Sequence, residues 1–503
     1  MNLGLLPLFA DESTRAVVAL EMMFTENFWV PTINGDYYYK KPPLYNWIIT
    51  AVFYLTGSMS EFVFRLPSVV PLFLFGFSIY KWSKKFIGQN MAFLAAGMFV
   101  TCGRMLVYAS FIGHIDIFYS WVTFLSFICL IKHGKEGNWT KFFVYSYALS
   151  AVAFLCKGLP TVLFQGISII VVLLALKKAK KFFSLEHLLG LLVFTIPVGG
   201  YFLKYYQFNK LDGWVEFLWT QSKQRTVMDK AWYESVIHIF KFPLDHLYHL
   251  APWSLFAIFM FRKGFKKELW NTPELKLLTL IFLANLPVYW LSPGYYPRYL
   301  FMLYPLLFIV VAFSFKTSPK ETLKKYFFTG FTVLGIVFMV GVVVIFILKN
   351  VGLEFSALQC GLVLALASFS IFLLRGLRGH LTSKLIGVIV LMASVRLLFN
   401  YVVMPDRLAS GKTNLYKTGA IKIAKQTQDT PLKIVRWTAM NHDATFYIER
   451  ERQKVLYHTL GFDKENLNLM ESSHFTHEPD ALILDSMQIR HENRIIYLVK
   501  DGK

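Results

Sequence analysis

The stretch "LPSVVPLFLFGFSIYKWSKK" (66–85) decides the fold class of this chain. An apolar run ends in a cluster of lysines, and the same pattern recurs along the sequence. Judged by their length, the apolar runs predict about twelve membrane-spanning helices. We place these spans at residues 66–86, 89–108, 115–132, 140–156, 160–176, 185–205, 244–261, 275–291, 297–315, 326–348, 354–374 and 383–404.

The charges between these runs predict the orientation of the spans. Lysine and arginine gather at every second connection, and the other connections are poor in both or are long. Because cytoplasmic loops carry an excess of basic residues, we place the basic set in the cytoplasm. The clusters are "KWSKK" (81–85), "KHGKEGNWTK" (132–141), "KKAKK" (177–181), "RKGFKK" (262–267), "KTSPKETLKK" (316–325) and "RGLRGHLTSK" (375–384).

The composition agrees with a multi-pass membrane protein. Of the 503 residues, 55% are hydrophobic and 17% are charged, whereas about 25% of a soluble domain is charged. The net charge of +21 lies in short clusters between apolar runs, so it does not indicate nucleic acid as a partner. The lipid bilayer is the partner that this composition predicts.

Two long regions outside the spans are predicted on the opposite, periplasmic side. Residues 11–65 form a first loop, in which "TRAVVALEMMFTENF" and "LYNWIITAVFYLTG" predict helices lying on the bilayer surface. Beyond residue 405, the runs "LKIVRW", "ATFYIER", "KVLYH", "ALILD" and "RIIYLVK" have a β-like pattern. The predicted fold is an all-α polytopic membrane domain (1–404) followed by a small soluble α/β domain (405–503).

The predicted periplasmic segments hold nearly all of the unusual polar groups. A single cation at the end of a span often only reaches the headgroups, but a lone carboxylate at a membrane rim needs a partner or a function. The carboxylates are Asp11, Glu12 and Asp116, and the neighbouring polar side chains are Arg15, Lys40, Lys41, Arg65, His114, Lys157, Arg298 and Tyr299.

Carboxylates and cations at a bilayer surface suit a substrate with a lipid-bound phosphate. The cations hold the phosphate and offset its charge as the bond to it breaks. A carboxylate accepts the proton of the attacking hydroxyl as a general base. These residue types therefore predict a group transfer from a lipid phosphate.

An ordered set of motifs resembles the membrane glycosyltransferases with a GT-C fold. The nearest branch is similar to the aminoarabinose transferase of lipid A, and the protein O-mannosyltransferases are more distant kin. The resemblance extends over residues 1–310 and rests on "DE" (11–12), "EM" (21–22), "VPTINGDYYYKKPPLYNW" (30–47), "FRLPS" (64–68), "GHID" (113–116), "FLCKGLP" (154–160), "APW" (251–253) and "SPGYYPRYLFMLYP" (292–305).

This resemblance implies an inverting glycosyltransferase with about 12–13 spans. It implies transfer of a sugar from a polyprenyl-phosphate carrier to an acceptor hydroxyl or phosphate on an envelope lipid, glycan or protein, at the periplasmic face of a bacterial inner membrane. The apolar opening "MNLGLLPLFA" (1–10) is too short to cross a bilayer. We interpret it as the end of a truncated first span, or as a re-entrant or interfacial stub.

The resemblance also implies roles for single residues. Asp11 resembles the catalytic carboxylate of the first loop, with Glu12 beside it, and Asp116 resembles the second acidic residue. Lys41 resembles the lysine that contacts the carrier phosphate. We group Lys40, Arg65 and Arg298 with Lys41 as donor phosphate-binding residues, and we group Arg15, His114, Lys157 and Tyr299 as substrate-binding residues.

Two positions depart from the pattern of the aminoarabinose branch. The arginine of its "DExR" motif comes one place later here, as Arg15. An acidic residue that the branch associates with metal binding is replaced by Lys40, and a cation repels a metal ion. We therefore assign no metal ligand and no certain cofactor. A divalent metal ion stays an open alternative. His246 and His249 are candidate ligands for it, because metal sites use their i,i+3 spacing.

Two other functions stay open at this point. A transporter or flippase of a lipid-linked sugar would place ionisable groups near the bilayer midplane, whereas the charges here gather on one face. An inactive relative would serve as a scaffold in an envelope complex. The sugar, the acceptor, the oligomeric state and the role of residues 405–503 do not follow from the sequence.

Overall fold

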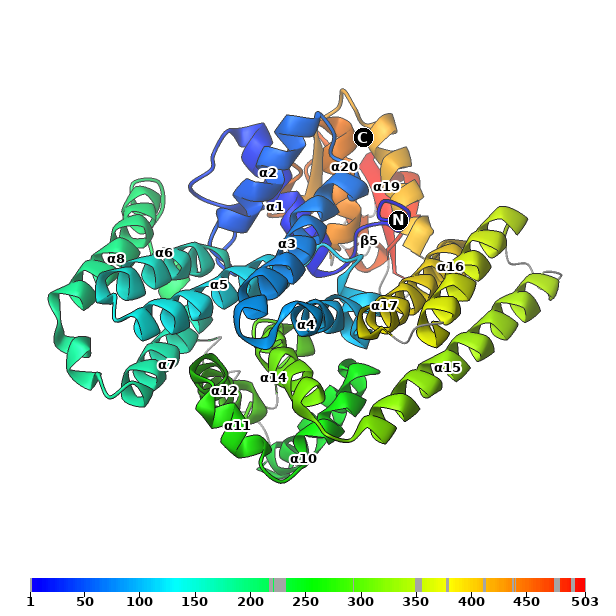
Figure 1. Ribbon diagram of the computed structural model, residues 1–503. Coiled ribbons are helices and arrows are strands. Elements are labelled where there is room, and N and C mark those ends of the chain that lie inside the picture. Colours follow the sequence, from blue (N-terminus) through cyan, green and yellow to red (C-terminus); the bar gives the residue numbers. More distant parts are fainter. Residues whose placement is uncertain are drawn as a thin grey trace. The chain divides into compact units, whose positions relative to one another are not determined.

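The computed structural model of the protein packs into two compact units, which are described separately (Figure 1). Unit 1 consists of residues 68–202 and 214–403, and unit 2 consists of residues 2–67, 203–213 and 404–503. The C-terminal region thus shares its unit with the first loop. The structure describes residues 2–216, 220, 232–292, 294–348, 355–376, 380–409, 413–436, 438, 440–474, 480–489 and 494–502.

Seven helices in these ranges are long and apolar enough to cross a membrane, so the chain is a multi-pass membrane protein. Within one continuous helical stretch, Leu381–Ala409, lie α17 (Leu381–Leu398) and α18 (Met404–Ala409). The other six are α3 (Glu61–Ile87), α5 (Ile115–Glu136), α6 (Trp139–Lys157), α8 (Leu185–Tyr206), α15 (Glu321–Ile347) and α16 (Ala357–Arg375).

The remaining predicted spans are shorter or interrupted in the structure. The predicted span 275–291 divides into two helices, the second of which begins at Pro287, and the predicted span 244–261 is interrupted before Pro252. Proline causes such breaks because it lacks an N–H and its ring clashes with the preceding turn. The helices concerned are α4 (Gln89–Thr101), α7 (Pro160–Ala175), α10 (Trp232–His249), α12 (Pro273–Asn285), α13 (Pro287–Trp290) and α14 (Tyr304–Thr317). Helix α11 (Phe265–Asn271) lies between two predicted spans.

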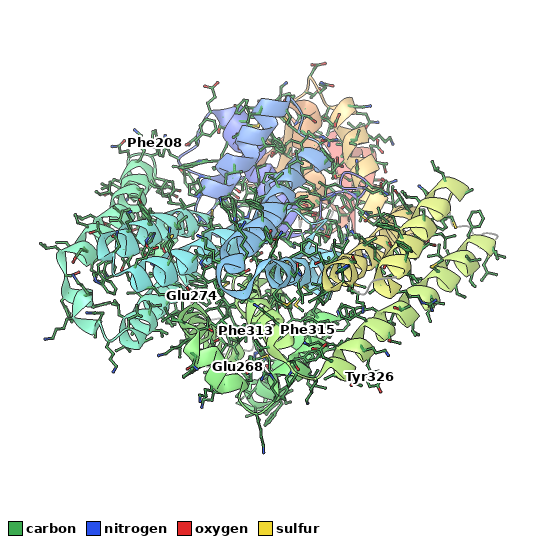
Figure 2. The ribbon with its side chains drawn as sticks, viewed as in Figure 1. Phe208, Glu268, Glu274, Phe313, Phe315 and Tyr326 are labelled. Atoms are coloured by element: carbon green, nitrogen blue, oxygen red, sulfur yellow. The ribbon has the colours of Figure 1, made fainter. Side chains whose placement is uncertain are left out.

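The core of unit 1 is rich in aromatic side chains. Helix α5 packs against α6, α7 and α12, and α14 packs against α4. Phe313 and Phe315 of α14, labelled in Figure 2, are both buried, and the ring of Phe315 lies 5.3 Å from that of Phe256. Such tilted aromatic pairs stabilise a core beyond the area they bury. This packing fixes the ends of α5 and α6, where the polar site of unit 1 begins.

Unit 2 begins with the first loop. It contains α1 (Asp11–Thr25), a hairpin of β1 (Thr32–Ile33) and β2 (Asp36–Tyr37), and α2 (Leu44–Thr56). The structure differs from the predicted surface position of α1, because residues 15–22 are buried without interruption, between α2 and α20 (His442–Arg452). Helix α2 buries Tyr45, Ile49 and Phe53, and Leu55 on its other face is exposed.

The C-terminal region of unit 2 is the predicted small α/β fold. Its five-stranded sheet has the order β4-β3-β5-β7-β6, with β3 parallel to β4 and β5 and with β7 antiparallel to β5 and β6. The elements are α19 (Thr413–Gln426), β3 (Leu432–Val435), α20, β4 (Tyr457–Thr459), β5 (Leu467–Glu471), β6 (Ala481–Gln488) and β7 (Ile495–Asp501).

One prediction for this region is wrong. The run "ATFYIER" (444–450) was predicted as β-like, but it forms the middle of helix α20. Residues 443–449 are all buried, because α20 packs against α1 as well as α19. A helix that is buried on most faces lacks the polar stripe that marks an amphipathic helix in a sequence.

Candidate active site

The first cluster of predicted site residues surrounds Asp116 in unit 1. Asp116 lies in the first turn of α5, where the helix dipole favours a negative charge, and only 3% of its surface is exposed. Lys157, at the end of α6, places Nζ 2.5 Å from Oδ1 of Asp116. Arg298 places Nε 3.3 Å from Oδ2 of the same carboxylate. The structure therefore brings together three residues that lie far apart in the sequence.

Aromatic rings surround the two cations of this cluster. Nζ of Lys157 lies 4.7 Å from the ring centre of Tyr119 and 4.3 Å from that of Tyr299. The guanidinium carbon of Arg298 lies 4.6 Å from the ring centre of Tyr296. The face of an aromatic ring attracts a cation, most strongly where water is excluded. The rings therefore hold these cations in a partly dry environment.

His114 and Arg104 belong to the same cluster. His114, directly before α5, interacts electrostatically with Asp116. Arg104, whose guanidinium carbon lies 4.0 Å from the ring centre of Tyr108, interacts with both Asp116 and Arg298. The reading of the sequence missed Arg104, although a lone arginine inside a predicted span (89–108) is itself a signal of function. Among the described residues, Lys157, Arg298 and Arg104 thus share the carboxylate of Asp116, which leaves these four charged side chains with a surplus of positive charge.

An apolar cavity of about 170 Å³ lies next to this cluster in unit 1. Tyr304 lines the cavity and also interacts with Arg104, so it joins the two features. His246 lines the cavity as well, and its Nδ1 donates to the carbonyl of Phe242 at 2.7 Å. The other lining residues are mainly leucines and aromatic residues, among them Leu250, Phe282, Leu303 and Leu307.

The second cluster of predicted residues lies in unit 2, at the start of α1. Asp11 is the first residue of α1 and is exposed. The Asp11 carboxylate and the Arg15 guanidinium both interact electrostatically with Tyr38, whose pKa is raised by burial. Arg15 itself is buried, with its guanidinium carbon 5.5 Å from the Tyr38 ring. Among the described residues, no acceptor bonds to its buried Nη1.

Glu12 and Arg65 form a wholly buried ion pair in unit 2. Nε and Nη2 of Arg65 donate to the two carboxylate oxygens of Glu12, at 2.8 and 3.0 Å. The remaining donors of Arg65 bind the carbonyls of Leu3, Leu6 and Pro7, at 2.6, 2.9 and 3.2 Å. All five N–H groups of the guanidinium are used in this way. This geometry favours a structural role for the pair rather than the predicted catalytic and phosphate-binding roles.

Lys40 and Lys41 lie between two elements that pack on α1. The β1–β2 hairpin precedes them, with Asn34 and Gly35 at positive φ, as in a two-residue type I′ turn. Pro42 and α2 follow them. Lys40 is exposed and Lys41 is half-buried. The lysines therefore occupy a short segment that is anchored at both ends.

The residues around Lys40 do not fit a divalent metal ion. His442 faces Lys40, and burial together with that positive charge lowers the pKa of His442 to about 4. Within the part of the chain that the structure describes, no three His, Cys, Asp or Glu side chains form a group that would hold a metal ion. The rings of His246 and His249 lie 6.2 Å apart and nearly perpendicular.

Comparison with known proteins finds similarity to glycosyltransferases. Residues 40–201 match the family model described as dolichyl-phosphate-mannose-protein mannosyltransferase. Over 228 residues the chain is 26% identical to undecaprenyl phosphate-alpha-4-amino-4-deoxy-L-arabinose arabinosyl transferase 1 of Proteus mirabilis. That match covers 44% of this chain and 40% of the relative, so it spans about two fifths of the relative's length.

The fold is also that of solved structures. Crystal structures of ArnT from Cupriavidus metallidurans, in the apo state and bound to undecaprenyl phosphate, align with a TM-score of 0.70 at 17% identity. The apo alignment covers 100% of this chain and 95% of the other. The predicted resemblance is therefore confirmed for the fold: the chain has the GT-C fold of the ArnT structures, and residues 40–201 are similar to the mannosyltransferase family model.

Proposed function

We propose that the protein is an inverting glycosyltransferase that uses a polyprenyl-phosphate-linked sugar as its donor. The observation that carries this proposal is the cation cluster of unit 1 together with its apolar cavity. Arg104, Lys157 and Arg298 face a single carboxylate, and Tyr304 joins them to the cavity. A prenyl phosphate has the matching pair of features, an anionic head and an apolar chain.

In this proposal the cations bind the leaving group. Arg298, Arg104 and Lys157 hold the donor phosphate, and Asp116 keeps two of them in place. In the first loop, Lys41, Lys40 and Arg15, whose buried Nη1 has no acceptor among the described residues, are proposed as further substrate-binding residues. Charge-assisted hydrogen bonds of this kind become more favourable as negative charge develops on the departing phosphate.

Asp11 acts as the general base. The acceptor hydroxyl gives its proton to the Asp11 carboxylate, and its oxygen forms a bond to the anomeric carbon of the donor. The bond from that carbon to the phosphate oxygen breaks, and polyprenyl phosphate leaves with the electron pair. A single displacement of this kind inverts the anomeric carbon. Glu12 and Arg65 support the start of α1 and do not contact substrate.

The proposed location is the periplasmic face of the bacterial inner membrane, and the acceptor is an envelope lipid, glycan or protein. The side opposite the basic connections faces the periplasm under the positive-inside rule. The name of the Proteus mirabilis relative and the undecaprenyl phosphate bound to ArnT support a donor with a polyprenyl-phosphate carrier.

Transfer and transport are separated by an assay on the purified full-length protein in vesicles. Donors with different sugars on undecaprenyl phosphate are supplied with an envelope extract as acceptor, and mass spectrometry follows the products. We expect a new glycosidic bond and release of undecaprenyl phosphate. Movement of donor lipid between leaflets without a new bond would favour the flippase instead. Mass spectrometry of envelope glycolipids and glycoproteins from a deletion strain then identifies the sugar and the acceptor.

A further inference from the structure

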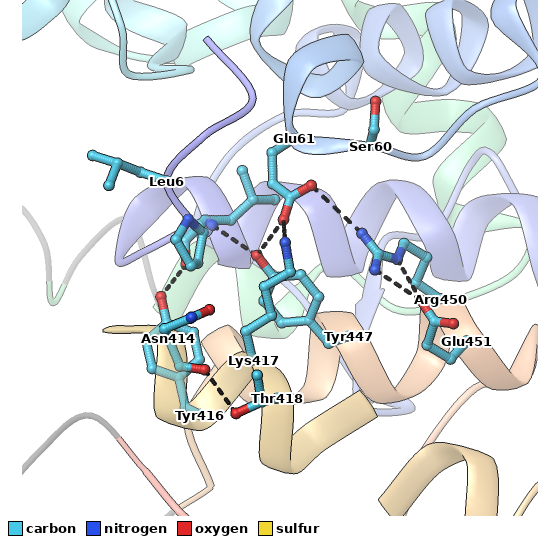
Figure 3. A network of polar contacts seen from close by, with 12 residues as sticks. Leu6, Ser60, Glu61, Asn414, Tyr416, Lys417, Thr418, Tyr447, Arg450 and Glu451 are labelled. Atoms are coloured by element: carbon cyan, nitrogen blue, oxygen red, sulfur yellow. Dashed lines mark hydrogen bonds and ion pairs between the residues drawn. The ribbon is translucent and has the colours of Figure 1, made fainter. Parts of the chain in front are cut away.

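Helix α20 contacts the first loop of unit 2 at both ends of α1. Asp443, Tyr447 and Glu449 are buried on α20, and each bonds to a residue of the N-terminal 67 residues. Tyr447, for example, accepts from the backbone N–H of Leu8 at 3.0 Å and donates to the Glu61 carboxylate at 2.9 Å. Figure 3 shows that Lys417 and Arg450 bind the same Glu61 carboxylate.

Asp443 fixes the start of α1. Its Oδ1 accepts from the backbone N–H of Ala10 at 3.0 Å and from the hydroxyl of Ser13. Ala10 has φ 55°, a left-handed conformation that a non-glycine residue adopts only when its surroundings hold it. Asp11 follows Ala10 directly. The bond from Asp443 therefore holds the backbone of Ala10 in this conformation, and the backbone of Ala10 determines the position of Asp11.

Glu449 fixes the hairpin through Glu21 near the end of α1. The Glu21 carboxyl group accepts from Thr32 Oγ1 at 2.5 Å and from the backbone N–H groups of Asn34 and Gly35, at 3.3 Å for Gly35. Glu449 also contacts the hairpin directly, because its Oε1 accepts from Nδ2 of Asn34 at 3.4 Å. The carboxyl groups of Glu21 and Glu449 are both fully buried and interact with each other, which favours the protonated form.

The surroundings of this acid pair contain few other charges. Burial raises the pKa of Glu21 to about 7 and also raises the pKa of Glu449. From α20, the Arg452 guanidinium faces Glu449 while it donates to the carbonyls of Thr427 and Thr430.

Other titratable groups lie on the elements next to the pair. Asp36 of β2 pairs with His458 of β4 at 3.0 Å, and His442 of α20 faces Lys40. Helix α2 carries no acidic or basic side chain.

The hairpin and α2 together determine the position of Lys41. The N–H of Tyr38 donates to the carbonyl of Pro31 at 2.8 Å, which closes the base of the hairpin before the lysines. After them, the hydroxyl of Thr50 in α2 donates to the carbonyl of Ala19 in α1 at 3.3 Å. Any loosening of the hairpin from Glu21 therefore moves one of the two anchors of Lys41.

We propose that Asp443, Glu449 and Glu21 are positioning residues, through which the C-terminal region orients Asp11 and Lys41 for the reaction. Asp443 acts on Asp11 through Ala10 and Ser13, and Glu449 acts on Lys41 through Glu21 and the hairpin. The reaction part of this inference rests on the proposed function. The structural part, that α20 immobilises α1 and the hairpin, stands without it.

Four variants of the full-length protein in detergent test this inference, with Asp485→Asn as a matched control. Asp485 is in the same C-terminal region and pairs with Lys422 at 2.8 Å, away from α1. The variants are Asp443→Ala, Asp443→Asn, Glu449→Ala and Glu449→Gln. Hydrogen–deuterium exchange of residues 8–41 and steady-state transfer kinetics are measured for each protein.

We expect the two alanine variants to affect different kinetic constants. Asp443→Ala lowers kcat by roughly tenfold to a hundredfold with little change in donor KM, since misplacing a reacting group by about 1 Å costs on that order. Glu449→Ala raises donor KM about tenfold, because Lys41 contacts the donor phosphate. Both raise exchange in the segment that they hold. The control changes neither measurement.

The conservative variants separate positioning from simple loss of folding. In Asp443→Asn the new amide oxygen still accepts from the N–H of Ala10, and in Glu449→Gln the new amide group still donates to Glu21. We therefore expect both variants to regain most activity near pH 7. Glu449→Gln also removes one of the two buried carboxyl groups. After correction for the intrinsic rise of amide exchange with pH, we therefore expect the protection of residues 32–37 to depend less on pH near 7 than in the wild type.

Unchanged exchange and unchanged kinetics in folded alanine variants would overturn the inference. Equal loss of kcat and donor affinity in all four variants would also overturn it, because that pattern indicates general destabilisation. If the wild type transfers no sugar while the exchange results hold, the proposed function fails and the immobilisation by α20 stands.

Discussion

The two polar clusters of this protein are built in opposite ways. In unit 1, cations gather around one carboxylate: Arg104, Lys157 and Arg298 all interact with Asp116. In unit 2, buried carboxylates gather around the main chain of one loop, as Glu21 and Asp443 do. Surplus positive charge suits the binding of an anion. Carboxylates that accept backbone N–H groups instead fix a conformation.

In the proposed function, the two clusters have different roles. The cations of unit 1 share one carboxylate, Asp116, so their surplus charge favours a phosphate ligand. In unit 2, the carboxylates of Glu21 and Asp443 bond to the first loop, whereas Asp11 at the start of α1 is exposed.

The largest expected effect is on donor binding by unit 1. In the double variant Arg104→Gln/Arg298→Gln, we expect the affinity for undecaprenyl phosphate to fall about 10²–10⁴-fold, since two hydrogen bonds to a charged group contribute roughly 1.5–3 kcal/mol each. Lys157 still pairs with Asp116, so no buried charge is left alone. Native mass spectrometry or a radioligand assay measures the affinity. Arg262→Gln, which breaks a pair with Glu268 elsewhere in unit 1, is the control. Equal affinity in all three proteins would contradict the assignment of anion binding to this cluster.

The next effect concerns stability in unit 2. Glu12→Gln leaves Arg65 buried without its carboxylate, so we expect the free energy of unfolding to fall by about 3–5 kcal/mol. Denaturant unfolding in micelles measures this change. Glu321→Gln breaks the exposed pair with Lys324 and should cost under about 1 kcal/mol. If the two variants lose a similar free energy of unfolding, the buried pair Glu12–Arg65 supports the fold no more than the exposed pair Glu321–Lys324 does.

A smaller effect follows from the acid pair Glu21 and Glu449. In the unfolded chain Glu21 loses its proton near pH 4.3, but in the folded protein it keeps the proton until about pH 7. The unfolded state therefore binds fewer protons between these values, and stability falls as pH rises through this window, by on the order of 3 kcal/mol. Denaturant unfolding at a series of pH values from 4.5 to 8 measures how the free energy of unfolding changes with pH. Glu21→Gln removes the titrating carboxyl group and should flatten the dependence of stability on pH, and a dependence that persists unchanged would exclude Glu21 as its source.

The smallest effect concerns Arg15. Lysine at this position keeps the charge but lacks the planar guanidinium that places Nη1 beside Tyr38. We expect Arg15→Lys to weaken undecaprenyl phosphate binding about fivefold, the equivalent of one modest hydrogen bond. Titration of the purified variant beside the wild type measures it. An unchanged affinity would confine phosphate binding to the lysines of the first loop and to unit 1.

Much of the fold could be predicted from local patterns. Apolar runs with basic ends predicted α3, α5, α6 and α8, because burial in a bilayer depends on a continuous apolar stretch. The interruptions near Pro252 and Pro287 were missed, although proline is the residue that causes them. Helix α20 was missed because it is buried between α19 and α1, and α1 lies hundreds of residues away in the sequence.

The candidate site could be predicted only in part, because residue type does not reveal its partner. Asp116, Lys157 and Arg298 were each chosen from the sequence, and the structure brings them together. Arg65 was predicted to bind phosphate on the same grounds as Arg298, but in the structure Glu12 and three carbonyls accept from all of its donors. Such a difference depends on contacts between distant segments, which no local pattern contains.

The central claim is that Asp11 is the base and that the donor phosphate is held by other residues. The most direct test compares the wild type with Asp11→Asn in one preparation, with transfer and undecaprenyl phosphate binding measured side by side. The account predicts that kcat falls about 10²–10⁴-fold, the usual contribution of a general base, while the dissociation constant stays within about twofold. An Asp11→Asn protein that binds the carrier and still transfers sugar at a rate near that of the wild type would contradict it.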